Sequence, residues 1–137
     1  MDQYKHTFPS YFPDDCPPNE ATDEEKELFR LCAGPVPTEE DFLSWYNKNP
    51  DKWANFVQAY GLSVFESKED CDRARRMNAN LRKQYPFCAT GNNNSDRGKI
   101  LHTPNKTNPR HFTWWVYEGV KPHMFFEMCI EGGGNSE

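Results

Sequence analysis

The apolar side chains of this chain are largely aromatic rings, and this feature limits what the chain can fold into. Hydrophobic residues make up only 36% of the 137 residues, but ten Phe, six Tyr and four Trp raise the aromatic share to 15%. Because each ring buries a large area, few side chains are needed to build a core. At this length one core is expected, so the sequence predicts a single domain.

Predicted strands and helices follow one another without a regular βαβ alternation. Period-two patterns and short apolar runs predict strands at 28–33, 62–65, 87–90, 98–103, 111–117 and 124–130. Capping residues and helical spacing predict helices within 38–50, 51–61 and 67–86. Within the strand at 111–117, Trp114 and Trp115 are predicted to point to opposite faces. The fold class is therefore predicted as α+β, with a largely antiparallel sheet and about three helices.

The chain divides into an arm, a domain and a tail. Residues 1–27 contain four prolines and a cluster of acids, which predicts an extended N-terminal arm. The arm also carries Tyr4, Phe8, Tyr11 and Phe12, so we expect it to lie against the domain or against a partner. The domain is predicted to span 28–131, and a glycine-rich flexible tail to follow at 132–137.

Charge is unevenly distributed along the chain. The net charge of −5 resolves into −10 over residues 1–72, +8 over 73–110 and −3 over 111–137. The basic segment predicts a surface for an anion or a partner. Its candidate residues are Arg73, Arg75, Arg76, Arg82, Lys83 and Lys99. The alternative is that the acidic arm folds over this segment and neutralises it.

The cysteines and the N-terminus indicate a reducing compartment. The five cysteines are scattered and form no Cys-x-x-Cys pair, so neither a disulfide framework nor a cysteine zinc site is expected. No apolar run resembles a signal peptide or a membrane-spanning helix, which predicts a cytoplasmic protein without membrane association. No ligand spacing predicts a metal, the loop at 91–98 lacks a phosphate-binding motif, and no cofactor is expected.

Six residues are candidates for binding a ligand. His102, Arg110, His111 and Thr113 lie in or beside two neighbouring strands, so they are expected to meet at one end of the sheet. Imidazole acts as an acid or base near neutral pH, and guanidinium binds phosphate or carboxylate. Arg30 and Ser63 are the other two residues that we expect to contact the ligand. The alternative is that these side chains only hydrogen-bond locally or face water.

Several motifs resemble those of a family of small bacterial proteins to which no activity is assigned. They are FPDDCPP at 12–18, GLSVF at 61–65 and HFTWW at 111–115. The resemblance implies a bacterial cytosolic domain. The order of Arg30, Ser63 and Glu127 is also similar to that of the arginine, serine and acid in ADP-ribosyl-transfer domains, which implies a reaction on NAD or another nucleotide.

Three functions are compatible with these features, and the residues leave open whether the chain is an enzyme. The first is an accessory module that binds a partner protein, as in a defence or toxin–antitoxin-like locus. The alternative is a transferase or hydrolase that uses NAD or another nucleotide. A second alternative is nucleic-acid binding through the basic segment 73–110.

Overall fold

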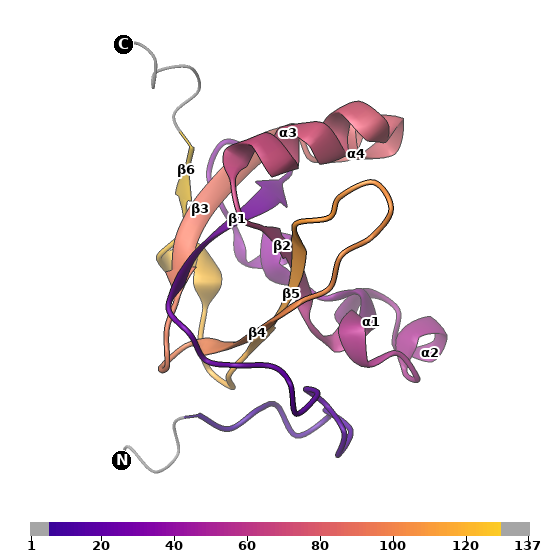
Figure 1. Cartoon of the computed structure of the whole chain (residues 1–137), viewed down its shortest axis with the longest axis vertical. Coiled ribbons are helices and arrows are strands. Elements are labelled where there is room, and N and C mark those ends of the chain that lie inside the picture. The colour runs from indigo at the N-terminus through magenta and orange to yellow at the C-terminus, as the bar shows by residue number, and fades with distance from the viewer. Residues whose placement is uncertain (1–5, 130–137) are drawn as a thin grey trace.

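The protein is a single α+β domain built on one six-stranded antiparallel sheet (Figure 1). The computed structural model describes residues 6–129. The strands lie in the order β4-β5-β2-β1-β3-β6. Their bounds are β1 Lys26–Cys32, β2 Leu62–Phe65, β3 Phe87–Asn93, β4 Gly98–His102, β5 His111–Val116 and β6 Glu127–Met128. The predicted α+β class is confirmed.

The strand predicted at 124–130 is much shorter in the structure. Its beginning belongs to a 3-10 turn, η4 (Pro122–Met124), and only β6 pairs with β3. Pro122 starts η4, and its carbonyl accepts hydrogen bonds from the amides of Phe125 and Phe126. The chain is therefore turned where the sequence pattern predicted extension. Residue 130, the last of that predicted strand, and the predicted tail at 132–137 lie outside the described residues.

Each of the three predicted helices is divided into two short segments. The first predicted helix becomes η2 (Glu39–Phe42) and α1 (Trp45–Lys48). The second becomes α2 (Pro50–Trp53) and η3 (Val57–Tyr60), and the third becomes α3 (Lys68–Met77) and α4 (Ala79–Gln84). Ser44 and Asn78 stand at two of the breaks and begin the next segment, because their side chains accept its free backbone amides. Short polar side chains compete in this way with helix continuation. At the third break Phe56 is extended, with φ −116° and ψ 106°.

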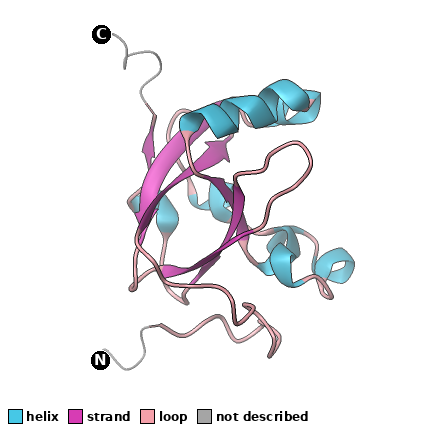
Figure 2. Ribbon diagram, viewed as in Figure 1, coloured by secondary structure: helices cyan, strands magenta, loops and turns pink. Residues whose placement is uncertain are grey.

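Both faces of the sheet are covered (Figure 2). One face carries the largest apolar cluster, which includes Leu28, Val64 and Trp114 and is closed by Phe126. On the other face α3 packs against β1, β2 and β3, and the arm packs at a distance from α3, against Trp115 of β5 and Leu101 of β4. Trp114 and Trp115 point to opposite faces as predicted, and both are fully buried.

The N-terminal arm packs against its own domain. Phe8 and Phe12 contact the cluster formed by Cys16, Tyr60 and Trp115, and Thr22 pairs with the edge strand β4. Figure 1 shows the arm at the end of the molecule away from α3 and α4. The described part of the arm therefore does not lie over α3 (Lys68–Met77) and α4 (Ala79–Gln84), the two helices that carry most of the predicted basic surface. Of the arm's predicted contact residues, Tyr4 lies outside the described range.

Within residues 6–129, none of the helices has the length and apolar character needed to cross a bilayer.

Candidate functional site

A cavity of about 330 Å³ lies on the face of the sheet that α3 covers. Its floor is formed by side chains of β1, β2 and β5, and its walls by α1, α3, α4 and the loop at 103–110. Three of the six candidate ligand residues, Arg30, Ser63 and His111, line this cavity. The apolar lining includes Leu31, Phe65, Ala74, Met77 and Leu81.

Ser63 and His111 are hydrogen-bonded to each other at the floor. Ser63 opposes Thr113 in the β2–β5 register and Phe65 opposes His111, so Ser63 and His111 are diagonal neighbours on one face. The distance from Ser63 Oγ to His111 Nε2 is 2.9 Å. Both residues are half-buried and line the cavity. A ligand in the cavity can therefore reach the pair.

The backbone of Thr103 sets the tautomer of the His111 ring. His111 Nδ1 lies 2.8 Å from the Thr103 carbonyl oxygen. A carbonyl only accepts, so Nδ1 carries the proton and, in the neutral ring, Nε2 is an acceptor. The Ser63 hydroxyl then donates to Nε2. This is the arrangement in which imidazole can remove a proton from a serine hydroxyl.

His111 is held in its neutral, basic form. Burial lowers the pKa of His111 below the ordinary 6.5, and the nearby charge of Arg30 lowers it further. The hydrogen bond to the Thr103 carbonyl opposes this shift only in part. At neutral pH the ring is therefore unprotonated and available as a base.

Arg30 reaches the cavity through a split in the sheet. β1 and β2 pair only at Phe29 and Phe65, whereas β1 pairs with β3 along seven residues. In the split, Arg30 Nη1 donates to the Ser63 carbonyl at 2.7 Å and Nε donates to the Asp41 carbonyl at 2.8 Å. Nη2 makes no hydrogen bond with any residue in 6–129. The guanidinium thus fixes the backbone of Ser63 and retains donors for a ligand.

The charged groups of the cavity are all cationic. Arg30 and Lys48 line it, and no Asp or Glu of residues 6–129 is among the residues that do. Lys48 Nζ lies 3.3 Å from the Tyr85 hydroxyl and 5.5 Å from the centre of the Trp45 ring, which places a cation among aromatic rings at the wall. A cavity of this kind attracts an anionic ligand, although the whole chain is acidic.

The remaining candidate residues are not brought to this cavity. Thr113 is buried beneath it, where its hydroxyl lies 2.8 Å from that of Thr103. His102 and Arg110 line a different hollow, more open to solvent, with Glu24 and Glu66. The expectation that all the strand residues meet at one end of the sheet is therefore wrong, because alternation sends His102 and His111 to different surroundings.

Glu127 also lies elsewhere. It is exposed on β6, which pairs with β3 at the far edge of the sheet. It does not line the cavity that Arg30 and Ser63 share. The three residues matched to ADP-ribosyl-transfer domains are thus not brought together.

Half of the predicted anion or partner surface is engaged within the molecule. Arg73 donates to the Thr107 carbonyl, Arg75 bonds with Asp72 and the Pro86 carbonyl, and Arg82 donates to the carbonyls of Arg75 and Arg76. These contacts fasten α3 to α4 and to the loop at 103–110. With the part of the chain that the structure describes, no such contact is made by the side chains of Arg76, Lys83 and Lys99.

Sequence reasoning missed Thr103, Lys48 and Asn108. The Thr103 contribution is a backbone carbonyl, which no side-chain pattern reveals. Lys48 is an ordinary surface lysine in the sequence, and only the position of α1 brings it to the cavity. Asn108 belongs to a polar loop that composition alone marks as solvent-exposed, yet it is 2% exposed.

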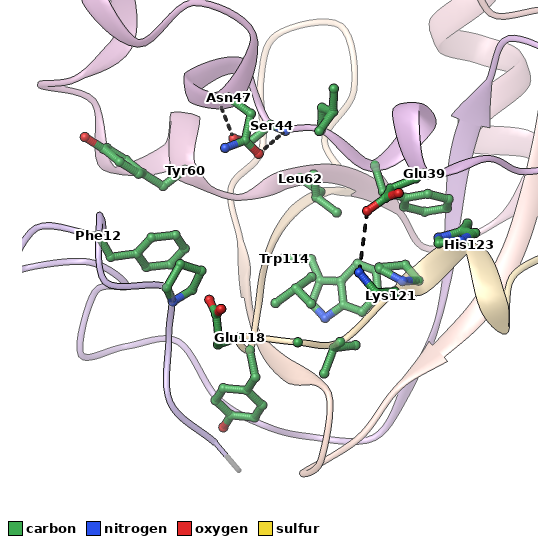
Figure 3. Close-up of a pocket in the computed structure, with 18 of the residues that line it drawn as sticks. Phe12, Glu39, Ser44, Asn47, Tyr60, Leu62, Trp114, Glu118, Lys121 and His123 are labelled. Atoms are coloured by element: carbon green, nitrogen blue, oxygen red, sulfur yellow. Dashed lines mark hydrogen bonds and ion pairs between the residues drawn. The ribbon is translucent and has the colours of Figure 1, made fainter. Parts of the chain in front are cut away.

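A second cavity of similar size lies beyond Leu43, Ser44 and Leu62, which line both (Figure 3). The arm forms one wall and the segment 116–123 another. Lys121 pairs with Glu39 at 3.5 Å there. Ser44 and His123 both line it, but no hydrogen bond joins these two described residues, so the first cavity is the better candidate for chemistry.

Cys16 and Cys32 are not nucleophile candidates. All five are free, and burial raises the pKa of the Cys16 and Cys32 thiols to about 12. Such thiols stay protonated at neutral pH and are poor nucleophiles. Across residues 6–129, no three His, Cys, Asp or Glu side chains are grouped so that they could hold a metal ion.

Comparison with protein-family models, with curated proteins and with solved structures found no match for this chain.

Proposed function

We propose that the protein is a hydrolase or transferase for a small anionic substrate of nucleotide size, with Ser63 as the nucleophile and His111 as its base. The observation that supports this proposal best is the 2.9 Å contact between Ser63 Oγ and the acceptor nitrogen of His111, inside a cavity whose charged groups are all cationic. A nucleophile, a base and an orienting group for the base are the parts that such catalysis needs.

The proposed reaction has two steps. Ser63 Oγ attacks a carbonyl carbon or phosphorus of the substrate, and its proton passes to His111 Nε2. The bond to the leaving oxygen breaks, and that oxygen takes the proton from Nε2. A water molecule, or the hydroxyl of an acceptor, then attacks the group held on Ser63 and gives its proton to Nε2, which restores the serine hydroxyl.

The cavity dimensions favour a mononucleotide over NAD. A volume of about 330 Å³ lies at the lower end of the range for small-molecule sites. Arg30 and Lys48 supply charge for a phosphate, and the side chains of Phe65, Trp45 and Tyr85 offer apolar and aromatic surface for a base. A dinucleotide would extend beyond this space.

The test uses a fluorophosphonate, which reacts with activated serine hydroxyls. We expect one adduct by intact mass, located on Ser63 by peptide mapping and absent from Ser63→Ala. His111→Gln should slow labelling by about a hundredfold or more, because general-base assistance is lost. Ser95→Ala, in an exposed loop, is the matched control. Labelling that survives in Ser63→Ala would contradict the proposal.

A specific surface supports a second candidate function, the binding of a partner protein. Trp45 and Phe56 are 52% and 55% exposed, and Trp53 connects them with ring centres 5.8 and 5.5 Å away. Lys48 and Lys52 lie over the two tryptophan rings. Exposed aromatic groups with a cationic border are typical of protein interfaces, and they fit a partner that presents an apolar anchor among acidic side chains.

Co-purification from the native host, followed by binding assays with the purified partner, tests this candidate. Trp45→Ala with Phe56→Ala should weaken binding by at least tenfold, whereas Val36→Ala, at an exposed site elsewhere, should have no effect. Equal binding by all variants would argue against it. Nucleic-acid binding through segment 73–110, a bacterial source and a cytoplasmic location stay predictions.

A further inference from the structure

One buried polar atom beside the candidate site has no hydrogen-bond partner in the part of the chain that the structure describes. Asn108 lines the cavity and is 2% exposed. Its Nδ2 donates to the Asp70 carbonyl at 2.9 Å, but its Oδ1 has no hydrogen-bond partner within residues 6–129 and is almost completely shielded from solvent. Among the buried side-chain nitrogen and oxygen atoms of the described residues, only His123 Nδ1 also lacks a hydrogen-bond partner.

The position of Asn108 is closely determined by its neighbours. Its backbone amide donates to Asn105 Oδ1 at 2.7 Å, and its carbonyl accepts from the amide of His111 at 3.3 Å. The side-chain amide cannot simply be reversed, because Oδ1 would then oppose the Asp70 carbonyl. Asn108 is thus held three residues before His111 with an unused acceptor.

An unused buried acceptor is costly, and buried polar groups are nearly always paired. A donor from a ligand would remove this cost. The same cavity carries Arg30 and Lys48 and, within the described residues, no acidic lining residue, so it favours a ligand that is anionic as well as able to donate. Among ligands of nucleotide size, an amino-bearing base satisfies both conditions.

We propose that Asn108 is a specificity-determining residue, whose side-chain carbonyl accepts a hydrogen bond from the amino group of an anionic mononucleotide. The inference rests on the proposed function for the nucleotide-size anionic ligand, and it does not depend on turnover at Ser63. A base with a keto group in place of the amino group would set two acceptors against each other and be rejected.

Calorimetry with matched nucleotide pairs tests the inference without any variant. Adenosine monophosphate should bind at least about tenfold more tightly than inosine monophosphate, and cytidine monophosphate more tightly than uridine monophosphate. Adenosine without phosphate should bind more weakly than its monophosphate. Equal affinity within both pairs, or no binding of any nucleotide at millimolar concentration, would overturn the inference.

Two variants separate this inference from the proposed function. Asn108→Leu, checked for folding by circular dichroism, should abolish the preference for the amino-bearing nucleotide, whereas Asn92→Leu on the exposed part of β3 should keep it. A preference that persists in folded Asn108→Leu would refute the role of Asn108. Ser63→Ala should retain nucleotide binding, so failed serine labelling with intact nucleotide preference counts only against the proposed chemistry.

Discussion

Replacing Arg30 by methionine should change both stability and the pKa of His111. The substitution keeps most of the packing against Phe42 but removes the two charge-assisted hydrogen bonds to the carbonyls of Ser63 and Asp41. Each such bond contributes about 1.5–3 kcal/mol. Part of that is offset because a buried cation no longer has to be desolvated. We therefore expect a loss of about 2–4 kcal/mol in the free energy of unfolding.

Urea denaturation and NMR titration measure the two effects. The midpoint of unfolding should fall without a change in its slope. Because the charge of Arg30 lowers the pKa of His111, its removal should raise that pKa, while burial still keeps it below 6.5. Arg76→Met, at an exposed site, is the matched control. Wild-type stability together with an unchanged His111 pKa would refute the argument that Arg30 connects β1 to β2 where the two strands are not paired.

The remaining predictions concern pH dependence, packing and the exposed aromatic patch. Labelling of Ser63 should rise with pH through a midpoint below 6.5 and be constant above it, since the lowered pKa keeps His111 neutral there; a midpoint above 7 would contradict this. The His111 contribution to stability should likewise be full above pH 6.5 and be lost as pH falls through the lowered pKa, which acid titration of the unfolding midpoint can measure. Gly91→Ala should cost about 1–3 kcal/mol, because its Cβ would lie 2.4 Å from the Phe126 ring, and Phe126→Leu should relieve part of the cost in a double-mutant cycle. Trp45→Ala should leave the melting temperature within about 2 °C of wild type, since the side chain is 52% exposed, and a larger drop would show that it supports the fold.

The strands were largely predictable because their signal is local. Alternation along 111–116 was sufficient to separate the faces of Trp114 and Trp115, and the structure buries them in different clusters. The helices were less predictable, because the side chains of Ser44 and Asn78 can either be tolerated in a helix or end it. Which of the two occurs depends on packing around the break.

The candidate site was predictable only in part. Ser63 and His111 could be named as candidates from residue chemistry, but their contact depends on the β2–β5 register, which connects segments 48 residues apart in sequence. Arg30 illustrates the limit of alternation, because a split between β1 and β2 carries its guanidinium to the Ser63 carbonyl.

By itself the sequence determined a single aromatic-rich α+β domain, the faces of its strands and the residue types available for chemistry, since these follow from length, alternation and side-chain character. Only the tertiary structure decided which of them meet. The Thr103 carbonyl that orients His111, the acid-free lining of the cavity and the unpaired Oδ1 of Asn108 arise from long-range packing. No local pattern encodes them, because each depends on backbone groups or loops that are positioned by the rest of the fold.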